Sequence, residues 1–210
     1  MKIAILTSPD QWFESYAAEF SSELDAVLFK SHEDIIDKYD ILFLLAYHKM
    51  VPESFLKKNT YNLIVHESNL PKGKGWAPLF WQVLEGKNTI KFSLLEASSE
   101  VDGGNIYFQD ELKLSGFELN SELRDKQAKL TINMCKNFIS KMHLSPKSFP
   151  QEGEESFFRK RTAEDSCLDV NKTIADQFNL LRIVDNAAYP AFFEIDGHRY
   201  FLKITRDRNE

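Results

Sequence analysis

The first 50 residues alternate between two patterns of hydrophobic positions. Residues 2–7 and 40–47 are short continuous apolar runs, which are typical of strands buried on both faces of a sheet. Between them, apolar residues recur at helical spacing over 11–24, residues 26–30 indicate another strand, and 32–37 indicate a short helix. This β-α-β-α-β order predicts a parallel sheet covered by helices on both faces, with ligands at the carboxyl ends of its strands.

The next 90 residues extend the same α/β pattern. Residues 77–86 predict a short helix that ends at Gly86, and residues 88–97 and 105–114 predict two further strands. From Asn120, which we expect to cap it, a long amphipathic helix is predicted through residue 142. The predicted fold class is therefore α/β with a mostly parallel sheet.

A second, smaller unit is expected after this helix. Residues 143–156 are rich in Pro, Ser and charge and lack periodicity, so we predict a first domain over 1–145 and a C-terminal subdomain over 146–210. Residues 170–182 indicate a helix, and two alternating apolar runs flank Asp196-Gly197, a pair favoured in tight hairpin turns. One helix and one hairpin bury little surface alone, so this subdomain should pack on the first domain or on a second subunit.

Composition narrows the class of protein. A hydrophobic content of 43% in 210 residues is enough for a core without covalent staples. The two cysteines, Cys135 and Cys167, are far apart and lack metal-ligand spacing, so neither a disulfide framework nor a metal site is expected. No apolar run approaches a targeting or membrane segment, and we expect a cytoplasmic protein. A net charge of −6 argues against a broad nucleic-acid-binding surface and favours small-molecule or protein partners.

Two loops after predicted strands carry candidate chemistry. The stretch IVHESNLPKGKGWAP, residues 64–78, places His66 at a strand end, followed by a basic loop with two glycines. The glycines allow close approach of the backbone to a ligand, and Lys72 and Lys74 could meet an anion. The stretch EVDGGNIYFQ places Asp102 before two glycines, again between predicted strands.

Each of these features also has a simpler interpretation. Asp102-Gly103 is by itself most readily a turn, and the basic triplet at 159–161 is typical of a solvated edge. Lys72 and Lys74 lack the sequence context of a phosphate-binding loop. No Ser or Cys stands in a nucleophile elbow.

The order and spacing of the two loops favour chemistry over the simpler interpretations. The segment HESNLPKGKGWAP…LEGKNTIKFSLLEASSEVDGGNIYFQ resembles the formyltransferase superfamily that uses 10-formyltetrahydrofolate, because both motifs agree in sequence, order and distance. The resemblance covers residues 40–110 by motif and residues 1–40 by layout. It implies a Rossmann-like formyltransferase domain and 10-formyltetrahydrofolate as co-substrate.

Members of this superfamily differ in acceptor: glycinamide ribonucleotide, methionyl-tRNA or nucleotide-linked amino sugars. The tail from Phe157 is similar to the tail of sugar N-formyltransferases that act on 4-amino sugars of bacterial surface glycans. Within that group, the stretch HESNLPKGKGW is most similar to the enzymes of pseudaminic-acid-type pathways. The resemblance therefore implies a UDP-linked 4-amino-4,6-dideoxy-hexose as acceptor, and we expect a homodimer. The acidic net charge also fits a nucleotide sugar better than tRNA.

One position departs from the family pattern. The family has Asn two residues before the His, where this chain has Ile64. Asn62 lies two residues further back, about 6.6 Å along a strand, so it cannot simply take over the role. Backbone N–H groups, a side chain from elsewhere in the chain, or His66 itself are the alternatives.

The resemblance and the residue chemistry together predict roles for the site residues. We expect His66 to act as general acid and base and Asp102 to orient its imidazole and favour the protonated form, which could donate to a developing oxyanion. By resemblance, the pterin should lie against the loop after residue 44, with residues 98–101 closing the other side. The residues expected at that cofactor site are Leu44, Tyr47, Lys49, Met50 and Val51.

The acceptor is expected beside His66 and on the tail. The residues predicted to hold the sugar nucleotide are Lys72, Lys74, Trp76, Arg159, Arg161, Arg182, Asn186 and Tyr189, the last five alternatively serving a dimer contact. Two other functions stay open: a hydrolase that passes the formyl group to water, and a non-catalytic module that binds folate or a nucleotide sugar.

Overall fold

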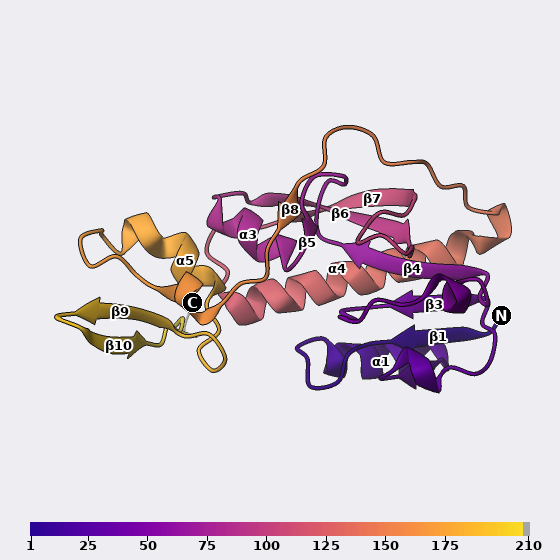
Figure 1. Cartoon of the computed structure of the whole chain (residues 1–210), viewed down its shortest axis with the longest axis horizontal. Coiled ribbons are helices and arrows are strands. Elements are labelled where there is room, and N and C mark those ends of the chain that lie inside the picture. The colour runs from indigo at the N-terminus through magenta and orange to yellow at the C-terminus, as the bar shows by residue number, and fades with distance from the viewer. Residues whose placement is uncertain (208–210) are drawn as a thin grey trace.

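A computed structural model describes residues 1–207, and a six-stranded sheet in the order β2-β1-β3-β4-β6-β7 forms its centre (Figure 1). The strands are β1 (Ile3–Leu6), β2 (Val27–Phe29), β3 (Ile41–Leu44), β4 (Tyr61–His66), β6 (Thr89–Glu96) and β7 (Ile106–Lys113). Strands β1 to β4 pair in parallel, whereas β6 is antiparallel to both of its neighbours. The predicted α/β class with a mostly parallel sheet is confirmed.

Five α-helices and two short strand pairs complete the fold. The helices are α1 (Glu14–Leu24), α2 (Glu53–Leu56), α3 (Pro78–Leu84), α4 (Asn120–Lys141) and α5 (Phe178–Ile183). The 3-10 helices are η1 (His32–Asp34), η2 (Met142–Leu144), η3 (Ala163–Ser166) and η4 (Ala175–Gln177). The additional strands are β5 (Lys74–Gly75) with β8 (Phe157–Phe158), and β9 (Ala191–Ile195) with β10 (His198–Leu202).

Successive residues of the central strands enter different hydrophobic clusters. In β1, Ile5 packs in the cluster that contains Phe20 of α1 and Phe138 of α4, while Ala4 packs in the cluster that contains Phe55 of α2. Because side chains alternate across a strand, this division explains why the sequence of β1 is continuously apolar. Both faces of the sheet are covered, and the carboxyl ends of the parallel strands are left to carry loops.

The long helix α4 begins differently from the prediction. Asn120 is its first helical residue and not its cap, and the side chain of Asn120 donates a hydrogen bond of 2.8 Å to the carbonyl of Ile183. The Glu122 carboxylate instead accepts from the backbone N–H of Leu119. Asn120 is thus used to hold α5, which the local sequence could not show.

The predicted helix over 170–182 is shorter than expected. Helical structure begins after Thr173, whose hydroxyl and backbone N–H bond the carboxylate of Asp176, while the Asp176 N–H bonds the Thr173 hydroxyl. This reciprocal pair satisfies N–H groups at the helix start, so residues 170–173 remain in a turn. The predicted hairpin is confirmed, with Asp196 at φ 49° and Gly197 at φ 79° forming its turn.

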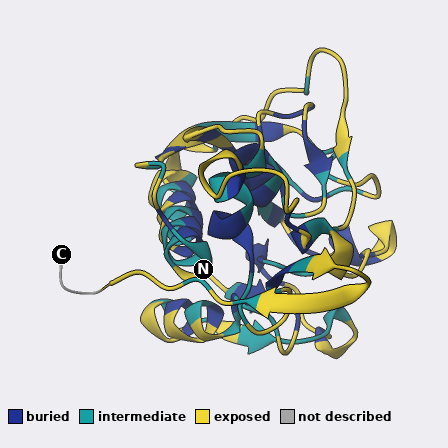
Figure 2. Ribbon diagram, turned by 90° about the vertical axis from the view of Figure 1, so that its left-hand side faces the viewer, coloured by how far each residue is buried: buried dark blue, intermediate teal, exposed yellow. Residues whose placement is uncertain are grey.

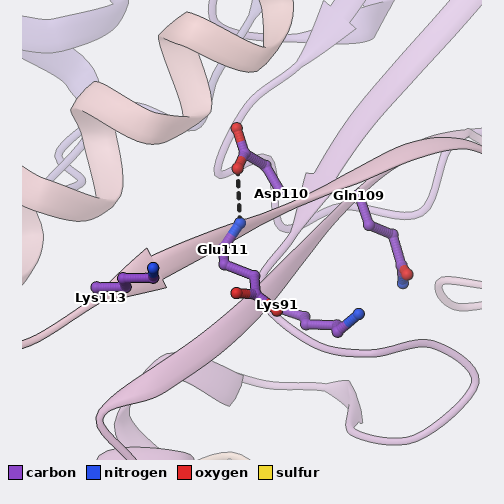
Figure 3. Close-up of a pocket in the computed structure, with 5 residues that line it drawn as sticks. All are labelled: Lys91, Gln109, Asp110, Glu111 and Lys113. Atoms are coloured by element: carbon purple, nitrogen blue, oxygen red, sulfur yellow. Dashed lines mark hydrogen bonds between the residues drawn. The ribbon is translucent and has the colours of Figure 1, made fainter.

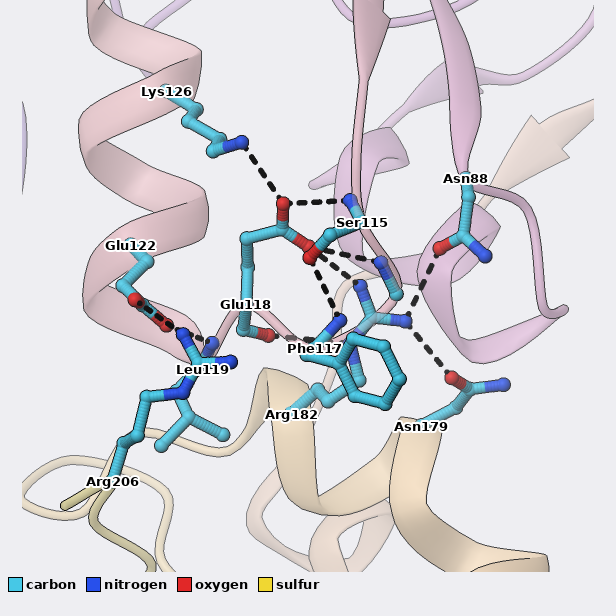
Figure 4. Close-up of polar contacts among 11 residues, drawn as sticks. Asn88, Ser115, Phe117, Glu118, Leu119, Glu122, Lys126, Asn179, Arg182 and Arg206 are labelled. Atoms are coloured by element: carbon cyan, nitrogen blue, oxygen red, sulfur yellow. Dashed lines mark hydrogen bonds and ion pairs between the residues drawn. The ribbon is translucent and has the colours of Figure 1, made fainter. Parts of the chain in front are cut away.

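The C-terminal segment is joined to the first part of the chain by a buried ion pair. Arg182 of α5 is 1% exposed and lies 3.4 Å from the carboxylate of Glu118, and it also bonds the Glu118 carbonyl and the side chains of Asn88 and Asn179 (Figure 4). The segment therefore packs on the first part of the chain. The predicted division at residue 145 stays a prediction.

The hairpin β9–β10 extends away from the central sheet (Figure 1), and most of its residues are exposed (Figure 2). Phe193 and Tyr200 stack across its strands with ring centroids 5.4 Å apart. Among the described residues, no helix is both long and apolar enough to cross a membrane.

Candidate functional site

His66 is the last residue of β4, in the middle of the sheet. It pairs in register with Ser93 of β6 and is only 5% exposed. Its Nε2 lies 2.8 Å from the carbonyl oxygen of Gly73, and its Nδ1 lies 3.4 Å from a carboxylate oxygen of Asp102. The structure therefore brings together the two residues on which the sequence hypothesis depends.

The loop after β4 folds back so that its glycines face this pair. Gly73 and Gly75 have φ values of 78° and 96°, in the left-handed region that favours glycine. The Gly75 N–H donates a 2.9 Å hydrogen bond to the second carboxylate oxygen of Asp102. The loop thus contacts both members of the pair through backbone groups, the Gly73 carbonyl on the imidazole and the Gly75 N–H on the carboxylate.

Asp102 lies in the turn that its sequence predicts. It has φ 49°, and a Cβ at Gly104 would stand 1.7 Å from the carbonyl oxygen of Glu96, so only glycine fits there. The turn lets the chain leave β6, pass the site and return as β7. A simple turn and a site residue are therefore compatible at this position.

Both neighbours of the imidazole are hydrogen-bond acceptors. A carbonyl oxygen has no proton to give, so the contact with Gly73 requires a proton on Nε2 of His66. The carboxylate of Asp102 lies 3.4 Å from Nδ1, on the other side of the ring, where it can orient the imidazole. Nδ1 is thus the ring nitrogen that can exchange a proton with a reacting group.

Ile64 is in the position where the family pattern has Asn. It is partly buried against Leu70, Leu95 and Ile106. The side chain of Asn62 does not replace the missing amide, because it donates a hydrogen bond of 2.9 Å to the carbonyl of Leu56. Backbone N–H groups, a side chain from elsewhere in the chain and His66 itself remain the alternatives.

The residues predicted to hold the pterin divide into two groups. Leu44 and Val51 are buried in one apolar cluster with Ala97, which links the loop after β3 to the start of the loop that carries Asp102. Tyr47 is half-buried, and its hydroxyl bonds His32. Lys49 and Met50 are exposed. The apolar cluster offers the kind of wall that a pterin ring requires, bordered on both sides by loops of the candidate site.

Among the residues predicted for the acceptor, Lys74 is already paired within the fold, and its contact with the acceptor stays a prediction. Its side chain is 4% exposed and its ammonium already pairs with Glu155 at 2.5 Å. Lys72 and Trp76 are exposed and stay predictions.

The tail residues also separate into structural and available side chains. Arg182 is buried against Glu118, and the amide of Asn186 bonds both backbone groups of Ile204, so both are committed to the fold. Their predicted contact with a nucleotide stays a prediction. Arg159 is paired with Asp165, which lowers the pKa of that carboxyl, and Tyr189 is 41% exposed.

A group of cations and one indole, which we call the cation cluster, was only partly visible in the sequence. The members of the cation cluster are His48, Trp76, Arg124, Lys160 and Arg161. His48 lies 5.3 Å from Trp76 between ring centroids, and the Lys160 ammonium lies 4.9 Å from the Trp76 ring. Arg161 Nε is buried and has no hydrogen-bond partner within the described part of the chain.

The charges of the cation cluster influence one another. Burial, and then the positive charges of Lys160 and Arg124, lower the pKa of His48. Burial lowers the pKa of Arg124 to about 10, against the opposing charge of Glu67, so Arg124 stays protonated at neutral pH. Since mutually repelling cations gain most from an added negative charge, the cation cluster is suited to an anionic ligand.

Two open depressions lie elsewhere on the surface. One of about 520 Å³ is lined by Lys91, Gln109, Asp110, Glu111 and Lys113 on β6 and β7 (Figure 3). Another of about 310 Å³ lies beside α2 and is lined in part by Asn62, Glu96 and Ser98. Burial raises the pKa of Glu96 there, against hydrogen bonds from Asn62 and Tyr107. Neither lining includes His66 or Asp102.

No group of three or more His, Cys, Asp or Glu side chains among residues 1–207 could hold a metal ion.

Known proteins resemble this chain in sequence and in fold. The family model for formyl transferases matches residues 7–137. Methionyl-tRNA formyltransferase of Mycoplasma capricolum subsp. capricolum is 25% identical over 172 residues, which cover 80% of this chain and 54% of that protein. The chain thus spans about half the length of the curated relatives it matches.

Solved structures share the fold across the chain. Methionyl-tRNA formyltransferase from Clostridium thermocellum has a TM-score of 0.80 at 18% identity, covering 100% of this chain and 96% of that one. A sugar N-formyltransferase from Shewanella sp. has a TM-score of 0.72 at 12% identity, covering 100% of both chains. HypX from Aquifex aeolicus in complex with tetrahydrofolic acid has a TM-score of 0.71 at 19% identity, covering 97% of this chain and 37% of that one. With its family match across most of the chain and its two site motifs in contact, this chain belongs to the formyl transferase family.

Proposed function

We propose that the protein transfers the formyl group of 10-formyltetrahydrofolate to the 4-amino group of a nucleotide-linked amino-dideoxy sugar, with UDP as the expected nucleotide. The observation that carries the proposal is the His66–Asp102 pair, with Nδ1 and carboxylate 3.4 Å apart at the carboxyl end of β4. Family membership and the tetrahydrofolate complex of the HypX neighbour support the formyl donor. The sugar N-formyltransferase neighbour supports the acceptor class.

Residues around the pair fit a reduced folate. A pterin needs apolar walls and backbone hydrogen-bonding groups, and Leu44, Val51 and Ala97 belong to one apolar cluster that joins two loops near the pair. When bound, 10-formyltetrahydrofolate supplies an activated formyl group. Met50 and Lys49, both exposed at the same loop, would cover the outer part of the folate.

His66 has the central role in the proposed reaction. As an imidazolium held between the Gly73 carbonyl and Asp102, His66 donates a hydrogen bond from Nδ1 toward the formyl oxygen and delivers that proton to the nitrogen whose bond to the formyl carbon breaks. The neutral imidazole then accepts the proton that the attacking amine loses as its new bond to the formyl carbon forms. Asp102 holds the ring in place and stabilises its positive charge. The loss of the family Asn at Ile64 leaves this imidazolium as the main side-chain donor that we assign.

The cation cluster supports an anionic acceptor. The Lys160 ammonium lies over the exposed indole of Trp76, which can stack on a base or a sugar, and the electrostatic effects among His48, Arg124 and Arg161 indicate further positive charge nearby. A charge concentration of this size suits one or two phosphates, whereas a tRNA acceptor requires a broad basic surface that a net charge of −6 does not favour. Methionyl-tRNA is the competing acceptor, because the curated relatives are methionyl-tRNA formyltransferases.

We further propose that the protein acts in the cytoplasm as a homodimer. The exposed hairpin β9–β10 supports the dimer, because Tyr200 and Phe201 leave 49% and 65% of their surface uncovered.

The test is formation of tetrahydrofolate from 10-formyltetrahydrofolate in the presence of a UDP-4-amino sugar, a dTDP-4-amino sugar, methionyl-tRNA or water alone. The account predicts sugar-dependent release and a formylated sugar as product. Release of free formate without acceptor would show a hydrolase, and formylated methionyl-tRNA would show the competing acceptor.

A variant separates an enzyme from a binding module. His66→Asn should lower kcat by about 10²- to 10⁴-fold, the range typical of a lost acid–base group. The matched control is His198→Asn, because His198 is exposed on β10. A protein that binds folate equally well before and after the His66 substitution, with no turnover in either form, would be a non-catalytic module.

A further inference from the structure

We infer that residues 151–158, which we call the brace, position the catalytic pair and set the protonation pattern of its imidazole; this inference rests on the proposed function. The brace lies in and just after the stretch that the sequence marks as a boundary without periodicity. It is the last part of the arch that runs from the end of α4 over the sheet to β8 (Figure 1). It also lies outside the residues 7–137 that match the family model.

One end of the brace holds the loop that carries Gly73. The Gly73 N–H donates to the Ser156 hydroxyl at 2.9 Å and to the Ser156 carbonyl at 3.1 Å, and the Lys74 N–H donates to the same carbonyl at 2.9 Å. The Ser156 N–H donates back to the carbonyl of Pro71 at 3.3 Å. These bonds fix the peptide whose carbonyl accepts from Nε2 of His66.

The same strand pairing fixes Gly75, whose N–H bonds the Asp102 carboxylate. The Trp76 N–H donates a hydrogen bond of 3.0 Å to the carbonyl of Phe158, and a Cβ at Gly75 would lie 2.5 Å from that carbonyl oxygen. The two backbones are therefore in direct contact, which only glycine at position 75 allows. Lys74 adds its ion pair with Glu155.

The other end of the brace holds the turn that carries Asp102. The amide of Gln151 donates to the carbonyl of Asp102 at 2.6 Å and to that of Gly104 at 2.8 Å. Just before it, Phe149 exchanges two backbone hydrogen bonds with Ile106, so the start of the brace is anchored to β7. One short segment thus binds both loops whose residues meet at His66.

Burial indicates that these contacts are not there to build a core. Residues 152–157 are all exposed, and the brace contributes no member to the buried hydrophobic clusters of the described chain. Its bonds to the loops are polar and directional. Their main consequence is the geometry of the groups that face His66.

That geometry selects the reactive nitrogen. Since the Gly73 carbonyl retains the Nε2 proton, the proton that can be exchanged with reacting groups is the one on Nδ1, beside Asp102. If the brace is loosened, the Gly73 carbonyl is no longer held against Nε2 and the ring can rotate or change tautomer. The brace residues are thus positioning residues, acting on the imidazole through the backbone of both loops.

The test compares Ser156→Ala and Gln151→Ala with Glu152→Ala and Glu154→Ala, control variants in the same exposed segment whose side chains take part in none of these contacts. Each brace variant should lower kcat by about 10- to 100-fold while the KM for the formyl donor changes by less than about 3-fold. Ser156→Thr, which keeps the hydroxyl, should restore most of kcat. The controls should behave as the parent protein.

A second readout does not depend on turnover. Nitrogen-15 NMR of the histidine side chains, with His66 assigned by its loss in His66→Asn, should show a protonated Nε2 in the parent protein and in the controls. In Ser156→Ala the nitrogen-15 chemical shifts of His66 should move toward the values of a mixture of the two tautomers. If the parent protein shows no formyl transfer but the signal behaves as stated, the proposed function fails and the positioning stands. Unchanged His66 signals in both brace variants would overturn the inference, as would unchanged kcat.

Discussion

Two charged pairs of the structure are stabilised in different ways. Arg182 and Glu118 are 1% and 4% exposed in their side chains, and further hydrogen bonds surround both groups (Figure 4). His66 and Asp102 are 7% and 12% exposed, and backbone groups of a glycine loop contact both of them. The first pair joins two parts of the fold, whereas the second is held by loops that can present it to a ligand.

The difference shows why charge alone does not identify a site. Arg182 resembled a nucleotide ligand in the sequence, yet its partner Glu118 is already present in the folded chain and satisfies it. A site residue must keep an atom that the fold leaves available. Nδ1 of His66, which makes an ion-pair contact with Asp102 but no closer hydrogen bond, meets that condition.

The largest effect on stability should come from breaking the structural pair. Arg182→Ala leaves the Glu118 carboxylate buried with a lost partner, which should lower the free energy of unfolding by about 3–5 kcal/mol. Urea unfolding measures this loss, and kcat measured under folding conditions should stay near that of the parent. Arg206→Ala is the control, because its pair with Glu122 is exposed and should contribute less than about 1 kcal/mol. A small effect of Arg182→Ala would contradict the structural role.

The pH dependence of stability should report the carboxylate of Glu118, through its contacts with Ser115 and Lys126. Burial alone would raise the pKa of Glu118, but hydrogen bonds from Ser115 and Lys126 outweigh it and hold the pKa at about 2, below its ordinary value of 4.5. A lowered carboxyl pKa stabilises the fold above pH 4.5, and this contribution, of about 3 kcal/mol, is lost as the pH falls from 4.5 toward 2. Glu118→Gln should flatten the acid limb of an unfolding series, and an unchanged limb would contradict the assignment.

A smaller stability effect, with a larger effect on activity, is expected at the glycine loop. Gly75→Ala places a methyl group 2.5 Å from the Phe158 carbonyl at a φ of 96°, so β5 and β8 must separate. We expect a loss of about 1–3 kcal/mol in stability together with a fall in kcat. Gly153→Ala is the matched control, because its φ is 111° and nothing lies within 4 Å of the added group. Equal kcat in the two variants would contradict a role for the β5–β8 contact.

The smallest effect should appear in acceptor binding. Lys160→Ala removes one exposed cation from the cation cluster, and the KM for a UDP-linked amino sugar should rise by about 5-fold, or about 1 kcal/mol, with kcat unchanged. Because the interaction is electrostatic, the rise should diminish at high salt. Lys147→Ala, at an exposed position in the segment after α4, is the control. A KM that stays the same in Lys160→Ala would place the phosphates elsewhere.

Much of the fold could be predicted from the sequence because long elements have a clear periodicity. Ala4 and Ile5 face different clusters, and this two-sided burial appears in the sequence as a continuous apolar run. The Asp196-Gly197 hairpin followed from the positive φ values that its turn requires. The start of the helical segment that begins with η4 was missed because Thr173 and Asp176 cap each other inside an apparently continuous helical pattern.

The candidate site could be predicted only in part, for a physical reason. His66 and Asp102 appear in recognisable motifs, whereas their supports come from residues with no local pattern. The strands β5 and β8 have two residues each, too few for any periodicity, and they meet across about 80 positions of the chain. The contact of His48 with Trp76 likewise depends on tertiary folding.

The most direct test of the central claim is a double-mutant cycle on the pair, measured as kcat for formyl transfer with His66→Asn, Asp102→Asn and both substitutions together. If the imidazole and the carboxylate act as one unit, the double variant should lose little more activity than His66→Asn alone. Losses that simply multiply would mean that the two residues act independently, and that result would contradict the account.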